Sequence, residues 1–229
     1  MCAEARSTLV VFDCDGVLVD SEPLVQRVEM TMLAELGWPI TVAEIRAQHL
    51  GRPWPDIRAH IERRIGQPLP ADFRERRVAA NEALFAAELA AVPGIADALA
   101  RLARDGYRTC VASSGSHRRI ESVLGLTGLL DDFRGRIFSA EDVVHGKPAP
   151  DLFLHAASIL GVAPRRCVVV EDSPAGVGAA IAAGMPVIRY AAQTPGDLLA
   201  DATAVIEDMA LLPETVGRIA ATVSPGGRA

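Results

Sequence analysis

Apolar positions along the chain follow two patterns: short continuous runs rich in β-branched residues, and longer segments in which apolar residues recur at helical spacing. The runs predict strands at residues 8–12, 107–112, 136–138, 166–170 and 186–189. Two of the helices predicted between them have apolar faces made of Ile95, Leu99 and Leu102 and of Leu152, His155 and Ile159. Strands that alternate with helices predict an α/β fold with a Rossmann-like parallel sheet.

A long helical segment separates the first two predicted strands. They lie about 90 residues apart, far more than the dozen or so that one crossover helix needs. Residues 21–91 contain helical patterns, with Leu24, Val28 and Leu36 on one face, and no convincing strand. We therefore expect an inserted helical domain at 21–91, between core segments 1–20 and 92–229.

Charge and hydropathy exclude several functional classes. The 229 residues carry a formal net charge of −6 and no long basic run, which argues against a nucleic-acid partner. No apolar stretch reaches the roughly 20 residues of a membrane-spanning helix, and the N-terminus lacks the layout of a signal peptide, so we expect a cytoplasmic protein without a membrane partner. The cysteines have no metal-ligand spacing, and Cys14 is interpreted as a small buried residue with a reduced thiol.

One feature of the composition points to chemistry. Of the 23 lysine and arginine residues, only Lys147 is a lysine. A compact ammonium and a planar guanidinium suit different sites, so a chain that uses arginine elsewhere is expected to need an ammonium at this position.

Polar motifs follow four of the predicted strands, three of them directly and the one with Lys147 after a short segment. They are Asp13-Cys14-Asp15-Gly16, Ser113-Ser114-Gly115-Ser116, His145-Gly146-Lys147-Pro148 and Glu171-Asp172-Ser173-Pro174. Each alone has an ordinary explanation as a turn, a helix N-cap or a surface lysine. Because the carboxyl ends of parallel strands share one edge of the sheet, we expect the four motifs to meet there.

The expected meeting point combines an anion site with crowded acids. Hydroxyl groups and backbone amides at 113–116 open a helix, which suits a phosphate, so Ser114 and Gly115 are candidate substrate-binding residues. Carboxylates brought together at one edge raise one another's pKa unless a cation offsets them. Mg²⁺, which binds one or two carboxylates together with substrate phosphate, is the expected cofactor.

These motifs, in this order, resemble the haloacid dehalogenase superfamily. The similarity rests on Val11-Phe12-Asp13-Cys14-Asp15-Gly16-Val17-Leu18-Val19-Asp20-Ser21-Glu22, Ser113, Gly-Lys-Pro-Ala-Pro-Asp around Lys147, and Glu171-Asp172-Ser173-Pro174-Ala175-Gly176. The helical insert resembles the small cap of the subfamily that contains β-phosphoglucomutase and phosphoglycolate phosphatase. The resemblance spans essentially the whole chain and implies a monomeric, Mg²⁺-dependent phosphatase that acts on a small phosphorylated metabolite.

The resemblance also implies a role for each core residue. Asp13 is implied as the nucleophile that forms an aspartyl-phosphate, and Asp15 as the general acid and base. Ser113 is implied to bind a phosphoryl oxygen, and Lys147 to neutralise the nucleophile and the transferring group. The implied metal ligands are Asp13, the backbone carbonyl of Asp15, Asp172 and, with it, Glu171.

Alternatives within the family differ in what the sequence offers them. Asp15 and Asp172 argue against dehalogenation, and the absence of lysine from 21–91 argues against a Schiff-base phosphonate hydrolase. A sugar-phosphate mutase remains open, although Val25 and Trp54 stand where it has a histidine and an arginine. A catalytically silent phospho-ligand binding module is the alternative from another class.

The segment 49–56 resembles the loop by which such caps reach the core site. Gly51, Arg52 and Trp54 are its candidate substrate-binding residues, with loop packing as the alternative for Arg52 and Trp54. His49 and His60 are interpreted as surface or helix-packing residues rather than catalysts. The segment that holds Arg74, Arg76 and Arg77 is interpreted as a solvated helix face.

Overall fold

The computed structural model describes residues 8–49, 52, 54–191 and 201–223 of the chain. The chain divides into two compact units, one formed by Met1–Val19 with Ala90–Ala229 and the other by Asp20–Leu89. The first contains the sheet and is called the core unit, and the second is called the helical unit.

The core unit is built on a parallel sheet of six strands in the order β3-β2-β1-β4-β5-β6. These strands are β1 (Leu9–Phe12), β2 (Arg108–Ser113), β3 (Ile137–Ser139), β4 (Cys167–Glu171), β5 (Val187–Tyr190) and β6 (Ala204–Ile206). The five predicted strands are confirmed, and each begins one residue later than predicted. Strand β6 was not predicted, because it is short and, of its three residues, only Ile206 is buried.

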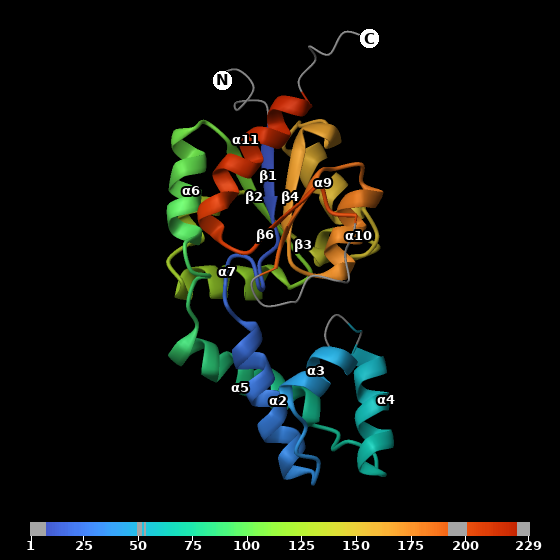
Figure 1. Cartoon of the computed structure of the whole chain (residues 1–229). Coiled ribbons are helices and arrows are strands. Elements are labelled where there is room, and N and C mark those ends of the chain that lie inside the picture. The colour runs from blue at the N-terminus through green and yellow to red at the C-terminus, as the bar shows by residue number, and fades with distance from the viewer. Residues whose placement is uncertain (1–7, 50–51, 53, 192–200, 224–229) are drawn as a thin grey trace. The chain divides into compact units, whose positions relative to one another are not determined.

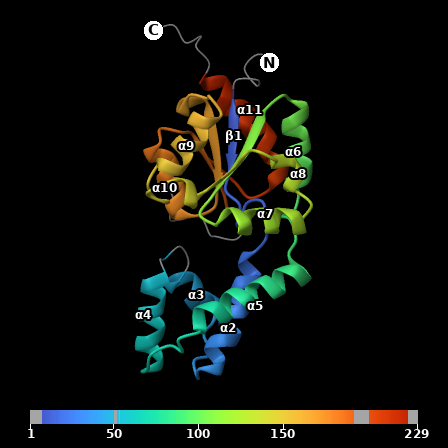
Figure 2. The same cartoon turned by 180° about the vertical axis from the view of Figure 1, so that it is seen from behind.

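Helices cover both faces of this sheet (Figures 1 and 2). On one face lie α6 (Ile95–Arg104) and α11 (Leu212–Thr222), and on the other α9 (Asp151–Ile159) and α10 (Pro174–Ala182). The connection from β2 to β3 contains α7 (His117–Leu126) and α8 (Leu130–Phe133). Single turns of 3-10 helix are η1 (Ala140–Asp142), η2 (Pro164–Arg166) and η4 (Met209–Leu211).

Burial on both faces explains why the strands are continuous apolar runs. All four residues of β1 are buried. Val11 pairs in register with Cys110 of β2 and Val169 of β4, and the three pack in one cluster with Phe153 of α9. Since side chains alternate along a strand, Phe12 points to the opposite face, where it meets the edge of the Phe133 ring.

The predicted helix faces fare differently. Ile95, Leu99 and Leu102 are all buried on α6, as expected. On α9 the prediction was partly wrong, because Ile159 is 64% exposed and His155 is only half-buried. The buried residues of α9 are Leu152, Phe153, Ala156 and Ala157. Two of these are alanines, which are only weakly hydrophobic, so the sequence pattern did not reveal the buried face of α9.

The helical unit has its own apolar core. Its helices are α2 (Glu22–Glu35), α3 (Val42–Gln48), α4 (Trp54–Ile65) and α5 (Phe73–Glu88). Thr41 begins α3 with a capping box in which its hydroxyl accepts from the Glu44 amide and the Glu44 carboxylate accepts from the Thr41 amide. The unit's core cluster includes Leu33, Trp38 and Ile61. None of the helices among the described residues is both long and apolar enough to span a bilayer.

Charged and polar side chains are also buried inside the helical unit. His49 Nδ1 is hydrogen-bonded to Glu29, and His49 Nε2 lies 2.8 Å from His60 Nδ1. The Trp38 ring packs edge-on against both imidazoles, at 6.1 and 5.5 Å between centroids. Burial, reinforced by His49 and nearby arginines, lowers the pKa of His60. These contacts agree with the interpretation of both histidines as helix-packing residues.

The arginines of α5 do not all share one environment. Arg74 and Arg76 are exposed, as a solvated face requires. Arg77 is half-buried, with its guanidinium carbon 4.7 Å from the centroid of the Trp54 ring, so the prediction was wrong for this residue. Burial lowers the pKa of Arg77, and the nearby Glu29 carboxylate opposes that effect. Arg77 is therefore part of the unit's interior.

Candidate active site

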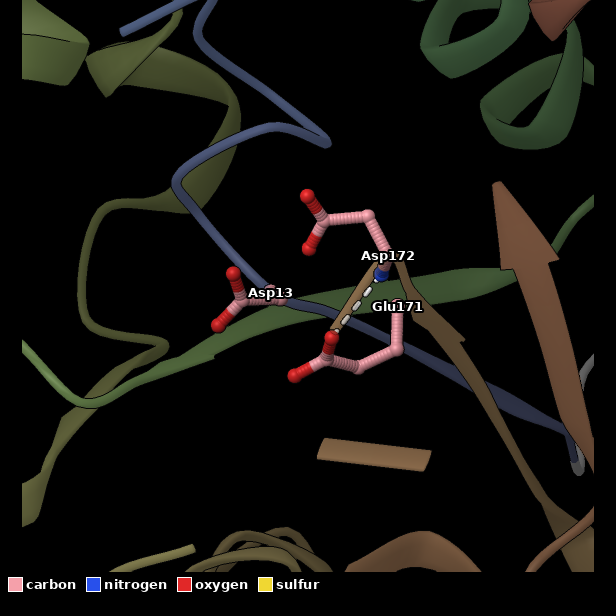
Figure 3. A group of neighbouring side chains, drawn as sticks. All are labelled: Asp13, Glu171 and Asp172. Atoms are coloured by element: carbon pink, nitrogen blue, oxygen red, sulfur yellow. Dashed lines mark hydrogen bonds between the residues drawn. The ribbon is translucent and has the colours of Figure 1, made fainter. Parts of the chain in front are cut away.

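The carboxyl ends of β1, β2 and β4 bring the predicted acids, serine and lysine together in the core unit. The β1–β4 ladder continues one residue past β1, because the Asp13 amide donates to the Val170 carbonyl at 3.0 Å. Asp13 is thereby fixed beside Glu171, the last residue of β4. Figure 3 shows the carboxylates of Asp13, Glu171 and Asp172 gathered at this point.

Lys147 lies at the centre of this arrangement. Its ammonium group donates to Asp13 Oδ1 at 2.6 Å, to Glu171 Oε1 at 2.8 Å and to the Ala112 carbonyl at 3.0 Å. Its side chain is 3% exposed, and Nζ lies 4.8 Å from the centroid of the Phe153 ring. An ammonium has three N–H donors, and all three have acceptors here. A planar guanidinium does not reproduce this three-way geometry, which accounts for lysine at this position.

Burial and the charge of the partner shift the pKa values of Asp13 and Lys147 in opposite directions. Burial raises the pKa of Asp13 to about 7, an effect that Lys147 opposes and that Glu171 and Asp15 reinforce. For Lys147, burial lowers the pKa, but Asp13 and Glu171 outweigh it and the net shift is upward. The ammonium therefore stays charged while it faces more than one carboxylate.

Glu171 is held in place from both ends of its carboxylate. Its Oε1 accepts from Lys147, and its Oε2 accepts from the amides of Asp172 and Ser173, both at 2.8 Å, and from the Ser173 hydroxyl at 3.0 Å. The backbone of α10 passes so close that a Cβ on Gly176 would lie 1.6 Å from Glu171 Oε1. Glycine is therefore required at 176 for this carboxylate to sit at the start of the helix.

Asp13, Glu171 and Asp172 each offer an oxygen to a common point. These oxygens lie within 4.8 Å of one another, and the three residues form the one candidate metal-ligand group among the described residues. Gly16, at φ +77°, lets the loop after β1 approach Asp172, since a Cβ there would lie 2.1 Å from Asp172 Oδ2. Three hard oxygen donors in this spacing fit Mg²⁺ and not a soft metal.

The serine-rich segment after β2 forms the second side of the site. Ser113 is buried, and its hydroxyl accepts from the Gly115 amide at 3.2 Å. The Ser139 hydroxyl donates to the Gly115 carbonyl at 2.6 Å and so ties the segment to the end of β3. Ser116 caps α7, while Ser114 is exposed. The predicted anion-binding segment therefore leads directly into a helix N-terminus.

Asp15 differs from the other predicted acids because it faces an arginine. Arg119 Nη1 donates to Asp15 Oδ2 at 2.5 Å, and Arg119 Nη2 donates to Asp15 Oδ1 at 2.9 Å. Burial lowers the pKa of Arg119, but hydrogen bonding to Asp15 and the charges of Asp15 and Asp13 raise it overall. Sequence reasoning missed Arg119. The signal was present, since an arginine in the first turn of a helix opposes the helix dipole.

The remaining candidate residues belong to the helical unit and are described within that unit. Gly51 lies outside the described residues. Arg52 is exposed, and its amide donates to the His49 carbonyl at 3.1 Å. The Trp54 ring stacks on Phe73 with 6.2 Å between centroids and an interplanar angle of 10°. With Arg77 also over this ring, Trp54 has a packing role, and substrate contact by these residues stays a prediction.

Cys14 is fully buried between the two aspartates of the first motif. Burial raises the pKa of its thiol, and the charges of Asp15 and Asp13 raise it further. The thiol therefore stays protonated and unreactive, as the interpretation of a small buried residue requires.

A parallel sheet that gathers three carboxylates and a buried lysine at the carboxyl ends of its strands defines an α/β enzyme. A family model described as haloacid dehalogenase-like hydrolase matches residues 8–184. The chain belongs to this family of hydrolases.

Similar proteins and similar solved structures support this family assignment. The 6-phosphogluconate phosphatase of Escherichia coli (strain K12) is 33% identical over 189 residues, which cover 82% of this chain and 84% of that protein. Hexitol phosphatase A of the same organism is 32% identical over 219 residues, 95% of each chain. A haloacid dehalogenase-like protein of Agrobacterium tumefaciens has a TM-score of 0.84 at 36% identity and covers 93% of this chain and 99% of its own. The predicted family, the α/β fold and the prediction of a phosphatase-type enzyme are confirmed.

Proposed function

We propose that the protein is a Mg²⁺-dependent phosphatase that hydrolyses a small phosphorylated metabolite through a phosphate ester of Asp13. The observation that carries this proposal is the contact of the chain's single lysine with Asp13 Oδ1 at 2.6 Å. A buried carboxylate held against an ammonium and beside two further acids has no packing function, and its geometry suits attack on an anionic phosphoryl group.

Asp13, Glu171 and Asp172 would hold the metal ion, with the Asp15 backbone carbonyl as a further ligand. The ion would neutralise charge that develops on the phosphoryl oxygens. Its donor set of carboxylate oxygens matches the preference of Mg²⁺, which leaves coordination positions for water and substrate.

The chain's own groups perform the remaining steps. The Asp13 carboxylate attacks phosphorus, while Lys147 offsets the charge of the nucleophile and of the transferring group. The Ser113 hydroxyl and the backbone amides before α7 bind phosphoryl oxygens. Asp15 protonates the departing alkoxide and then takes a proton from the water that releases phosphate from Asp13.

The names of two relatives support a proposal about the class of substrate. By name, 6-phosphogluconate phosphatase and hexitol phosphatase A act on phosphate monoesters of polyhydroxylated six-carbon chains. We propose a substrate of this kind, with hydrolysis rather than transfer of the phosphoryl group to a second hydroxyl.

The test is release of inorganic phosphate from p-nitrophenyl phosphate, 6-phosphogluconate and a hexitol phosphate, with Mg²⁺ and with EDTA. We expect Mg²⁺-dependent turnover that Asp13→Asn abolishes, because the amide is not a nucleophile. Arg118→Ala, on an exposed residue beside the site, is the matched control and should retain activity. Absence of metal-dependent turnover would favour a silent binding module, and an isomeric sugar phosphate without phosphate release would favour a mutase.

A further inference from the structure

The pair formed by Asp15 and Arg119 is the feature of the core unit that the proposed function does not yet explain. Arg119 Nη1 donates to Asp15 Oδ2 at 2.5 Å and Arg119 Nη2 donates to Asp15 Oδ1 at 2.9 Å, so the two groups form a two-point fork. The residues lie 104 positions apart, and their side chains are 32% and 37% exposed, so the pair is neither a local helix contact nor a fully solvated one. Such a fork fixes the plane of the carboxylate as well as its position.

Arg119 occupies a position that local electrostatics disfavours. It lies in the first turn of α7, where its amide donates to the Ser116 hydroxyl that caps the helix, at 3.3 Å. The partial positive charge of a helix N-terminus repels a cation, and this turn has Arg118 beside Arg119 and no acidic residue. Residues that break a local rule are expected at functional sites, where another interaction compensates. Here the compensating partner is Asp15.

The arginine also counters a repulsion between the two aspartates of the nucleophile loop. Asp13 and Asp15 are like charges two residues apart in the loop after β1. The Arg119 side chain also lies close to the segment 113–116 that is proposed to bind phosphate. Its Nη1 would lie 3.5 Å from a Cβ on Gly115.

We propose that Arg119 is a positioning residue for the second half of the reaction, in which it holds Asp15 as the base that activates water. The inference rests on the proposed function. In this step the water oxygen bonds to phosphorus and the bond between phosphorus and the Asp13 oxygen breaks. The electron pair returns to the Asp13 carboxylate, and the water proton goes to Asp15. A fork of two N–H donors fits an ionised carboxylate, the form of Asp15 that can accept a proton.

The two halves of the reaction respond differently to loss of Arg119. With p-nitrophenyl phosphate, the nitrophenolate leaves without needing a proton, so the first half should be little affected. We expect Arg119→Ala to lower kcat about 10- to 100-fold, with a similar fall in KM and a change in kcat/KM below about threefold. A burst of nitrophenolate equal to the enzyme concentration should appear, and intact-mass measurement after acid quench should show the phosphoenzyme accumulating.

Two further variants complete the experiment. Arg118→Ala removes the same charge from the neighbouring exposed position and should leave kcat and KM unchanged. Arg119→Lys keeps the charge but binds one oxygen only, so its rate of phosphoenzyme hydrolysis should lie between those of wild type and Arg119→Ala. Thermal unfolding of each variant separates lost activity from lost folding, and Arg119→Lys carries the test if the alanine variant does not fold.

Three results would overturn the inference while leaving the proposed phosphatase intact. They are an equal fall in kcat and kcat/KM without a burst, full activity of Arg119→Ala, or full recovery by lysine. An inactive wild-type enzyme would instead remove the proposed function itself.

Discussion

The carboxyl edge of the sheet and the interior of the helical unit both bury ionisable side chains, but they balance charge differently. At the sheet edge, Lys147 is the cation that faces both Asp13 and Glu171, and the pKa of Asp13 is raised to about 7. In the helical unit, the Glu29 carboxylate is paired with His49, which also contacts His60 inside an apolar core. Burial is therefore common to both regions. At the sheet edge two carboxylates share one ammonium, whereas in the helical unit one carboxylate has an imidazole partner with Arg77 nearby.

The largest expected effect comes from a substitution that disrupts the charge arrangement at the sheet edge. Lys147→Met removes the cation but keeps most of the side-chain volume, so Asp13 and Glu171 lose their shared partner. We expect kcat for p-nitrophenyl phosphate to fall about 10³-fold or more at saturating Mg²⁺, since electrostatic stabilisation of the transferring group is lost. Initial rates measure this effect. Retention of a tenth of wild-type activity would show that Lys147 has only a structural role.

Lys147→Arg sharpens the same prediction. It keeps the charge but cannot place three N–H donors on Asp13, Glu171 and the Ala112 carbonyl in the observed geometry. Activity should therefore remain far below wild type. Recovery by arginine would indicate that charge alone matters and would contradict the explanation for the chain's single lysine.

The sequence could predict the sheet edge because strand ends are marked by composition. Apolar runs such as Val168–Val170 end directly in acids, and parallel topology then requires these ends to meet. The contact of Arg119 with Asp15 was not predicted, because the two residues are 104 positions apart and only the folded chain brings them together. The interior of the helical unit was less predictable, since a half-buried Arg77 and an exposed Arg76 look identical in the sequence. Strand β6 was missed because three residues carry too little pattern.

The second prediction breaks the buried pair of the helical unit. His49→Ala leaves the Glu29 carboxylate, whose side chain is 5% exposed, without its imidazole partner. Leaving a buried charged group without its partner typically costs about 3–5 kcal/mol, and the nearby Arg77 offsets part of that, so we expect a loss of about 3 kcal/mol. Urea unfolding followed by tryptophan fluorescence reports on this unit alone, because both tryptophans, Trp38 and Trp54, belong to it.

Arg76→Ala is the matched control in the same unit. Arg76 contacts Glu35 at 3.2 Å, with side chains that are 51% and 57% exposed. An exposed pair of this kind contributes about 0.5 kcal/mol or less, so the urea midpoint should barely move. Similar losses for both variants would show that the Glu29–His49 pair contributes no more than a surface ion pair.

The last prediction concerns the free energy of unfolding at the sheet edge, where we expect a substitution to stabilise the protein rather than destabilise it. Because burial raises the pKa of Asp13 from 3.8 to about 7, the folded metal-free protein binds this proton more tightly than the unfolded chain. The associated stability is fully present below about pH 4 and is lost as pH rises through about 7. Asp13→Asn cannot ionise, so at pH 8 with EDTA we expect it to be more stable than wild type by about 2 kcal/mol.

Circular dichroism melts at pH 5 and pH 8 measure this difference, with the variant showing the shallower loss between them. Mg²⁺ should reverse the order at pH 8, because it binds the wild-type carboxylates and stabilises the folded state by mass action. Equal pH dependence in the two proteins would mean that Lys147 already neutralises Asp13 fully. The contrast with the Glu29–His49 pair would then disappear, because the sheet edge would hold no uncompensated charge for a metal ion to relieve.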